Sequence, residues 1–117
     1  MKWMLVFMGG GIGSLVRYVF ARLVPFQAAT FPWATFAANA FACLILAFCF
    51  FYLKEHKSWS LIQPFILIGF CGGLSTFSTF SSENFQLLQQ GQLTIFWINV
   101  FSSLAIGLLA FWIFARH

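Results

Sequence analysis

Four long apolar stretches limit this chain to one kind of fold. Each runs for roughly 20 residues or more, the length that a helix needs to cross the hydrocarbon core of a bilayer. Hydrophobic residues make up 62% of the 117 residues and charged residues only 7%, far from the balance of a soluble domain. We therefore predict an all-α integral membrane protein, a single domain over residues 1–117, with helices at 3–23, 32–53, 61–88 and 93–115.

The charged side chains lie mainly in the connections and at the ends of the chain. A net charge of +4 would suggest an anionic partner for a soluble protein, but cations placed this way anchor spans to lipid headgroups. We expect the lipid bilayer as a partner and no nucleic acid. With four spans, one side carries Lys2, Lys54, Lys57 and Arg116, and the other carries Arg17 and Arg22. This bias is weak under the positive-inside rule and leaves both orientations open.

Small residues recur at helical spacing in the first two spans. Gly9 and Gly13 form a GxxxG pair, which lets another helix approach closely. The second span repeats the device with Ala34, Ala38 and Ala42. Asn39 lies on an adjoining stripe and fits two interpretations equally, as a hydrogen-bonding group between helices or as a pore-lining group.

The segment from Gly69 to Asn84 places glycines, hydroxyls and a carboxylate inside the third apolar stretch. We predict a break in this helix between Gly72 and Thr76, because paired glycines weaken a helix. In a membrane, a helix is broken only where protein or a polar cavity supplies partners for the freed backbone groups. Freed carbonyl oxygens would be ligands for an alkali cation, and a close-packed kink without an ion is the other interpretation.

Aromatic and hydroxyl side chains alternate after the break. Phe77 and Phe80 are three residues apart and share one helical face, with hydroxyls on both sides. Hydroxyls that face hydrocarbon would be unpaired, so we expect this segment to line a polar pathway rather than to contact lipid. The positive edges of the rings would stabilise an anion without a fixed cation that traps it. Glu83 fits the mouth of such a pathway, a cation path or a proton relay.

The fourth stretch carries a small, polar face. Asn99, Ser103 and Gly107 recur every four residues and therefore lie on one side of a helix. Four short helices offer little surface on which to bury this face, the small-residue stripe of the second span and a broken third helix. We therefore expect the chain to self-associate.

Together these elements resemble the Fluc/CrcB fluoride channel family. Three elements in the family's order carry the match: GGGIGSLVRY at 9–18, FPWATFAAN at 31–39 and GFCGGLSTFSTF at 69–80. The four-helix layout extends the resemblance over essentially the whole chain. Two positions depart from the family's pattern, Ala34 where glycine is frequent and Ser75 where threonine is usual.

The resemblance implies an antiparallel, dual-topology homodimer in the cell inner (plasma) membrane, a multi-pass protein with two fluoride pathways along the subunit interface. It also implies a structural Na+ at the dimer centre, held by the backbone carbonyls of Gly72 and Ser75. Serine in place of threonine should preserve that site, because the ligand is a main-chain oxygen. The residues that the resemblance assigns to the fluoride pathway are Asn39, Phe77, Phe80, Ser78, Thr79, Ser81 and Ser103, with Arg17 and Glu83 near the vestibules.

The function that the resemblance implies is passive, selective export of cytoplasmic fluoride. The alternative is a small dual-topology, proton-coupled multidrug transporter, which has similar length but relies on a glutamate in its first helix, where this chain has none. A third interpretation is an accessory subunit that packs against the helices of a larger complex. An enzyme is not expected, because no nucleophile, base and orienting residue stand together.

Overall fold

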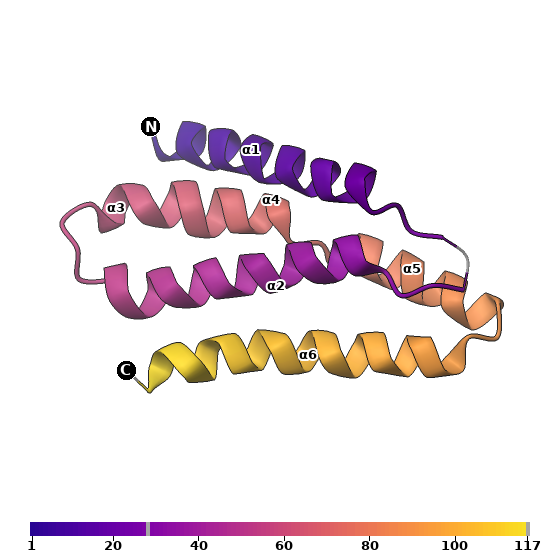
Figure 1. Ribbon diagram of the computed structural model, residues 1–117. Helices are drawn as coiled ribbons and strands as arrows, with labels where there is room; N and C mark the ends of the chain where they lie inside the picture. The colour runs from indigo at the N-terminus through magenta and orange to yellow at the C-terminus, as the bar shows by residue number, and fades with distance from the viewer. Residues whose placement is uncertain (28, 117) are drawn as a thin grey trace.

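The computed structural model describes residues 1–27 and 29–116, and these residues form helices without a strand (Figure 1). Four helical segments are long and apolar enough to cross a membrane: Lys2–Leu23, Trp33–Leu53, Trp59–Gln89 and Leu93–Ala115. The prediction of four spans is confirmed. The largest difference in a boundary is at the start of the third span, which begins at residue 59 rather than 61.

The four spans divide into shorter elements. The first is one helix, α1 (Lys2–Leu23), and the second joins α2 (Trp33–Phe48) to a π-helical turn, η1 (Cys49–Leu53). The third contains α3 (Trp59–Ile62), the π-helical η2 (Gln63–Cys71), α4 (Gly72–Leu74) and, after a break, α5 (Phe77–Gln89). The fourth is α6 (Leu93–Ala115).

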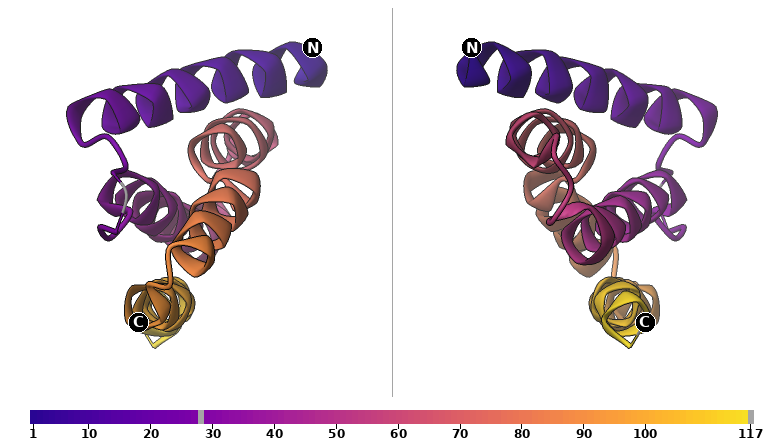
Figure 2. Two further views of the ribbon diagram at one scale, coloured as in Figure 1. Left: turned by 90° about the vertical axis from the view of Figure 1, so that its right-hand side faces the viewer. Right: turned by 90° about the vertical axis from the view of Figure 1, so that its left-hand side faces the viewer.

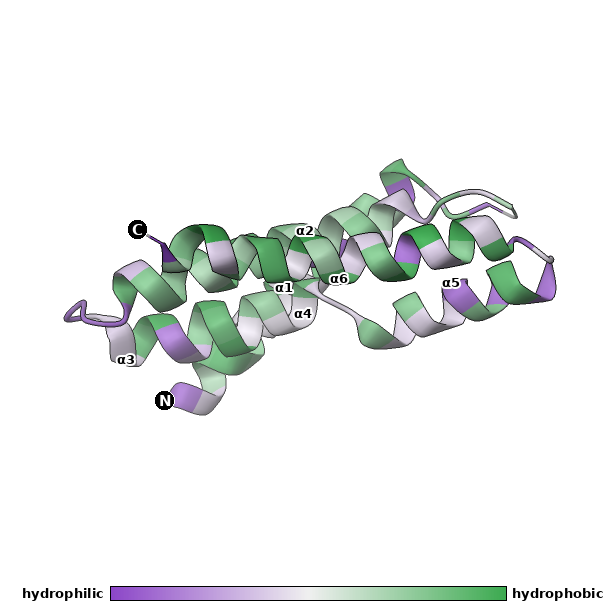
Figure 3. Cartoon of the chain, turned by 90° about the horizontal axis from the view of Figure 1, so that it is seen from below, coloured by the Kyte–Doolittle hydropathy of each residue, from purple (hydrophilic) through white to green (hydrophobic). Residues whose placement is uncertain are grey.

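The spans form a flat bundle, with extents of 50 × 32 × 19 Å. Its long dimension exceeds the roughly 40–45 Å of a bilayer with its headgroups. The N-terminus, the connection between η1 and α3, and the end of α6 lie together at one end of the bundle (Figure 1). Viewed along the bundle, α1 is inclined across the other helices (Figure 2). Hydrophilic residues gather in the connections at both ends (Figure 3).

Glycines allow α1 to pack directly against the first half of the third span. A Cβ added to Gly9 would clash with the Phe65 carbonyl oxygen, and one added to Gly13 with the Phe70 carbonyl oxygen. From the other side, a Cβ on Gly73 would clash with the Gly10 carbonyl oxygen. The predicted packing role of the Gly9/Gly13 pair is therefore confirmed, because side chains at these positions would hold the two backbones apart.

The third span breaks two residues later than its glycines suggest. Gly72 is helical, with φ −65° and ψ −36°, whereas Ser75 (φ −77°, ψ 153°) and Thr76 (φ −152°, ψ 118°) are extended. The predicted break between Gly72 and Thr76 is confirmed, and it is confined to Ser75 and Thr76 while the glycines remain helical. Close packing on α1 holds Gly73 in helical conformation, so the glycines serve the helix contact and the hydroxyl residues form the break.

The small-residue stripe of α2 lies in the core. Ala38 and Ala42 are buried and form a cluster with Cys71 and Leu74 at the end of the first half of the third span. α2 also packs against α6, so it stands between the broken span and the last helix. This central position brings the two polar residues of α2, Thr35 and Asn39, to the level of the break.

Candidate functional site

The Asn39 side chain holds the break in the third span together. Its Oδ1 accepts a hydrogen bond from the Thr76 amide at 2.7 Å, and its Nδ2 donates to the Thr76 carbonyl at 3.4 Å. The Thr76 hydroxyl in turn accepts from the Thr79 amide at 3.1 Å and caps α5. Asn39 therefore pairs both backbone groups of an extended residue in mid-membrane, which meets the requirement for a broken helix there.

This arrangement releases two backbone carbonyls from their ordinary helical donors. In a continuous helix the Thr76 amide would donate to Gly72, but it donates to Asn39 Oδ1 instead. The Thr79 amide would likewise donate to Ser75, but it donates to the Thr76 hydroxyl. The carbonyl oxygens of Gly72 and Ser75 are thus freed at the break.

Arg17 pairs a further carbonyl at the same place. Its Nε donates to the Gly73 carbonyl oxygen at 3.0 Å and satisfies one of the orphan acceptors where α4 ends. The Ser75 hydroxyl donates to the Cys71 carbonyl at 2.8 Å, one turn earlier. The guanidinium keeps its other N–H groups for a second partner, because only Nε is used in this bond.

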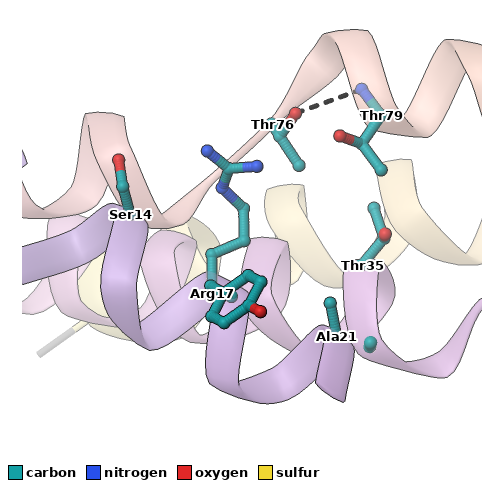
Figure 4. Close-up of a pocket in the computed structure, with 8 residues that line it drawn as sticks. Ser14, Arg17, Ala21, Thr35, Thr76 and Thr79 are labelled. Carbon is teal, nitrogen blue, oxygen red and sulfur yellow. Dashed lines mark hydrogen bonds between the residues drawn. The ribbon is translucent and has the colours of Figure 1, made fainter. Parts of the chain in front are cut away.

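A polar cavity lies between α1, α2 and the break. We call it the Arg17 cavity; it has a volume of about 320 Å³ and is lined by Ser14, Arg17, Tyr18, Ala21, Ala34, Thr35, Thr76 and Thr79. Figure 4 shows the Arg17 side chain extending from α1 toward the broken span, with Thr76 and Thr79 beyond it and Thr35 on α2. A cation surrounded by hydroxyls in this way suits a small anion.

A second cavity lies on the other side of the break. We call it the Phe cavity; it has a volume of about 470 Å³ and is lined by Asn39, Cys43, Ser75, Thr76, Phe77, Phe80, Val100, Ser103 and Leu104. The ring centroids of Phe77 and Phe80 are 6.3 Å apart, which confirms that the two rings share one face. Phe77 is 81% exposed in the single chain, so one wall of this cavity is open.

The predicted pathway residues divide between different surroundings. The Phe cavity brings together Asn39, Phe77, Phe80 and Ser103, whereas Thr79 lines the Arg17 cavity. Ser78 and Ser81 are exposed on α5 and line neither of these cavities. Of the two predicted vestibule residues, Arg17 lines a cavity and Glu83 is buried, with its Oε1 lacking a hydrogen-bond partner.

The polar face of α6 forms hydrogen bonds within the chain, although we expected too little surface within one chain to bury it. Asn99 is buried and donates through Nδ2 to Asn84 Oδ1 at 2.9 Å, and Ser103 donates to Asn99 Oδ1 at 3.2 Å. Gly107 lies beside Cys43 of α2. Sequence reasoning missed Asn84, because a polar residue near the end of a span is typical of the headgroup region. The available signal was an asparagine inside each of two helices that a short connection joins, α5 and α6.

Thr76 is the second residue whose role was missed. It lines both cavities and supplies both the extended backbone and the cap of α5. The two cavities therefore share the unwound residue in the middle of the third span. The four apolar spans define a small multi-pass membrane protein.

Comparison with known proteins identifies the family. Residues 4–114 match the family model described as "CrcB-like protein, Camphor Resistance (CrcB)". A protein of Flavobacterium psychrophilum named fluoride-specific ion channel FluC is 42% identical, over 90% of this chain and 86% of its own length. Proteins of the same name from Phocaeicola vulgatus and Pyrococcus abyssi are each 37% identical, over 91% and 88% of this chain and 88% and 84% of their own lengths.

This chain therefore belongs to the CrcB-like family. The relatives are ion channels by name, which places the chain with channels and not with enzymes. The family and the four spans make it a multi-pass membrane protein, which in bacteria means the plasma membrane.

Proposed function

We propose that this protein is a fluoride-selective channel through which fluoride leaves the cell passively. The Phe cavity is the observation that carries this proposal. Fluoride is small and strongly hydrated, so a pathway must replace its water with several donors at once. Phe77 and Phe80 offer positive ring edges, and the Asn39 amide retains a second N–H beyond the one given to Thr76.

Self-association completes the proposed pathway. Phe77 is 81% exposed, and Ser78 and Ser81 are also exposed on a helix that lies within a membrane span. Hydroxyls and an open cavity facing hydrocarbon are unfavourable, so a second copy that covers this face of α5 is favoured. The weak charge bias between the two ends fits two copies inserted in opposite senses. Such an antiparallel homodimer has two equivalent Phe cavities and therefore two pathways.

A structural Na+ at the dimer centre is part of the proposal. The carbonyls of Gly72 and Ser75 suit it, because both are released from helical hydrogen bonding at the break. Carbonyl oxygens are hard ligands of the kind that hold alkali cations in broken membrane helices. The ion would neutralise the partial negative charge of these carbonyls where the two copies meet.

The Arg17 cavity is proposed as the vestibule through which fluoride reaches the break. Arg17 lies beside the hydroxyls of Thr35, Thr76 and Thr79 there, so a hydrated anion would be attracted before it loses water. Glu83 lies one turn beyond Thr79 on α5. Its buried carboxylate would repel an anion and so limit how far the attraction of Arg17 extends toward the mouth of the vestibule. The multidrug-transporter alternative is not favoured, because the relatives found are fluoride channels by name.

Flux from liposomes tests the proposal. Purified protein is reconstituted, and fluoride and chloride efflux are followed with separate electrodes under a potassium gradient with valinomycin. Fast fluoride loss that follows the imposed voltage, with negligible chloride loss, is expected. Equal loss of both anions would contradict selectivity, and uphill flux driven by a pH gradient would indicate coupled transport instead.

A further inference from the structure

A buried polar contact joins α5 to α6 away from the walls of both cavities. Asn84 is 6% exposed and Asn99 is 1% exposed, and the Asn99 Nδ2 to Asn84 Oδ1 hydrogen bond measures 2.9 Å. Neither residue lines the Arg17 cavity or the Phe cavity. Burying amides in apolar spans is costly unless they form hydrogen bonds. The bond between them therefore holds the two side chains in a fixed relative position.

The contact continues to the proposed fluoride pathway through Ser103. The Ser103 hydroxyl donates to Asn99 Oδ1 at 3.2 Å, and Ser103 also lines the Phe cavity. A serine hydroxyl has one proton and two lone pairs. While its proton points at Asn99, Ser103 presents only lone pairs to the cavity, and these would repel an anion.

The direction of this chain of hydrogen bonds can be reversed without loss. Each asparagine ends in one carbonyl oxygen and one NH2 group of similar size, so a half turn of both amides exchanges donors for acceptors. Asn84 Nδ2 would then donate to Asn99 Oδ1, and Asn99 Nδ2 would donate to the Ser103 oxygen. The Ser103 proton becomes free to point into the Phe cavity, and the amide–amide and amide–hydroxyl contacts are both kept.

We propose that Asn84 and Asn99 form a reversible hydrogen-bond relay that turns the Ser103 hydroxyl toward an anion in the Phe cavity. The proposal rests on the proposed fluoride pathway and adds two positioning residues that do not touch the ion. In the reversed state the N–H of Asn99 also polarises the Ser103 hydroxyl, which strengthens it as a donor. Ser103 can therefore bind fluoride as it passes and release it when the relay returns.

The neighbouring serine provides a contrast within the same helix. Ser102 donates to the backbone carbonyl of Ile98, four residues earlier, and has no reversible partner. If Asn99 were leucine, Ser103 would have only the equivalent backbone carbonyl, and its proton would stay there. Ser102 also does not line the Phe cavity, so it serves as a matched control.

The experiment is a double-mutant cycle in the reconstituted channel. Fluoride efflux is measured for the unmodified protein and for Asn99→Leu, Asn84→Leu, Ser103→Ala and the two combinations of an asparagine change with Ser103→Ala. We expect Asn99→Leu and Ser103→Ala each to lower the rate about three- to tenfold, the worth of one hydrogen bond. Asn84→Leu should lower it less, because Asn99 remains. In the Ser103→Ala background, neither asparagine change should lower the rate further.

The outcomes separate this inference from the proposed function. Rates that multiply, so that each asparagine change has its full effect without Ser103, would overturn the relay and leave a purely structural contact. A Ser103→Ala rate equal to that of the unmodified protein would overturn it as well, and Ser102→Ala sets the size of an unrelated effect. An unmodified protein without fluoride flux would reject the proposed function itself. If Asn99→Leu fails to assemble, the Asn84→Leu cycle alone decides.

Discussion

The two halves of the third span differ in what they contact and in what they leave exposed. The first half, η2 and α4, packs against α1 through backbone atoms, with Gly9, Gly13 and Gly73 at the closest points. The second half, α5, makes its main contact with α6 and exposes Phe77 together with serine hydroxyls. One half is fixed within the chain, and the other exposes polar and aromatic groups on the surface of the single chain.

Asn39 stabilises the break between the two halves through its hydrogen bonds to Thr76. Because Asn39 accepts from the Thr76 amide, α5 can leave the axis of the first half without leaving that N–H unpaired in the membrane. Packing of the first half against α1 therefore sets the position of the break, and the break lets α5 run in a different direction. Substitutions in each half should therefore affect different measurements.

The largest effect is expected where backbones touch. Gly13→Val places side-chain atoms against the Phe70 carbonyl, which should cost about 3 kcal/mol, the upper end of overpacking penalties. Thermal unfolding in detergent measures the loss. Gly11→Val is the matched control, because a Cβ there meets no atom within 4 Å. Equal stability of the two variants would show that the close contact between α1 and the first half of the third span does not determine the stability of the protein.

The substitution Asn39→Leu should destabilise the break between the two halves of the third span. The Thr76 amide loses its partner, and an unpaired buried group costs about 2 kcal/mol. Faster hydrogen exchange of the Thr76 amide, with lower thermal stability, is the expected result. Cys43→Ala, one turn later in the same cavity wall, should leave this amide protected. Unchanged exchange in Asn39→Leu would mean that the break is held by other contacts.

Phe80→Ile and Phe77→Ile should affect flux rather than folding. Each removes one ring edge from the Phe cavity and should slow fluoride efflux about tenfold, while the protein still associates. Phe85→Ile is the control, because this exposed ring of α5 lines neither cavity. Full flux in a correctly assembled Phe80→Ile variant would remove the aromatic part of the proposed pathway.

The smallest effect should separate the charge of Arg17 from its bond. Arg17→Lys keeps a cation in the Arg17 cavity but lacks the planar Nε donor to Gly73, so we expect about 1 kcal/mol less stability with near-normal flux. Arg17→Gln should lose stability and flux together. If lysine lowers flux as much as glutamine, the bond to Gly73 matters more than the charge.

Much of the fold could be predicted from the sequence, and less of the site. The spans followed from length and hydrophobicity, and the GxxxG contact followed from residue size. The break lies within the predicted segment from Gly72 to Thr76, but the sequence did not show which of these residues unwind, because packing against α1 keeps the glycines helical. Asn39 left two interpretations open, and its bonds to Thr76 support the structural one, while its place in the Phe cavity keeps the other.

The sequence by itself determined that this chain crosses a membrane four times, that its third helix is broken and that it belongs to a family of small channels. These properties depend on the composition of contiguous segments and on short motifs, which are local. Only the tertiary structure decided which carbonyls are freed, which hydroxyls face each cavity, and that Asn84 reaches Asn99. Those properties depend on hydrogen bonds between residues up to 56 positions apart, and local periodicity does not specify such partners.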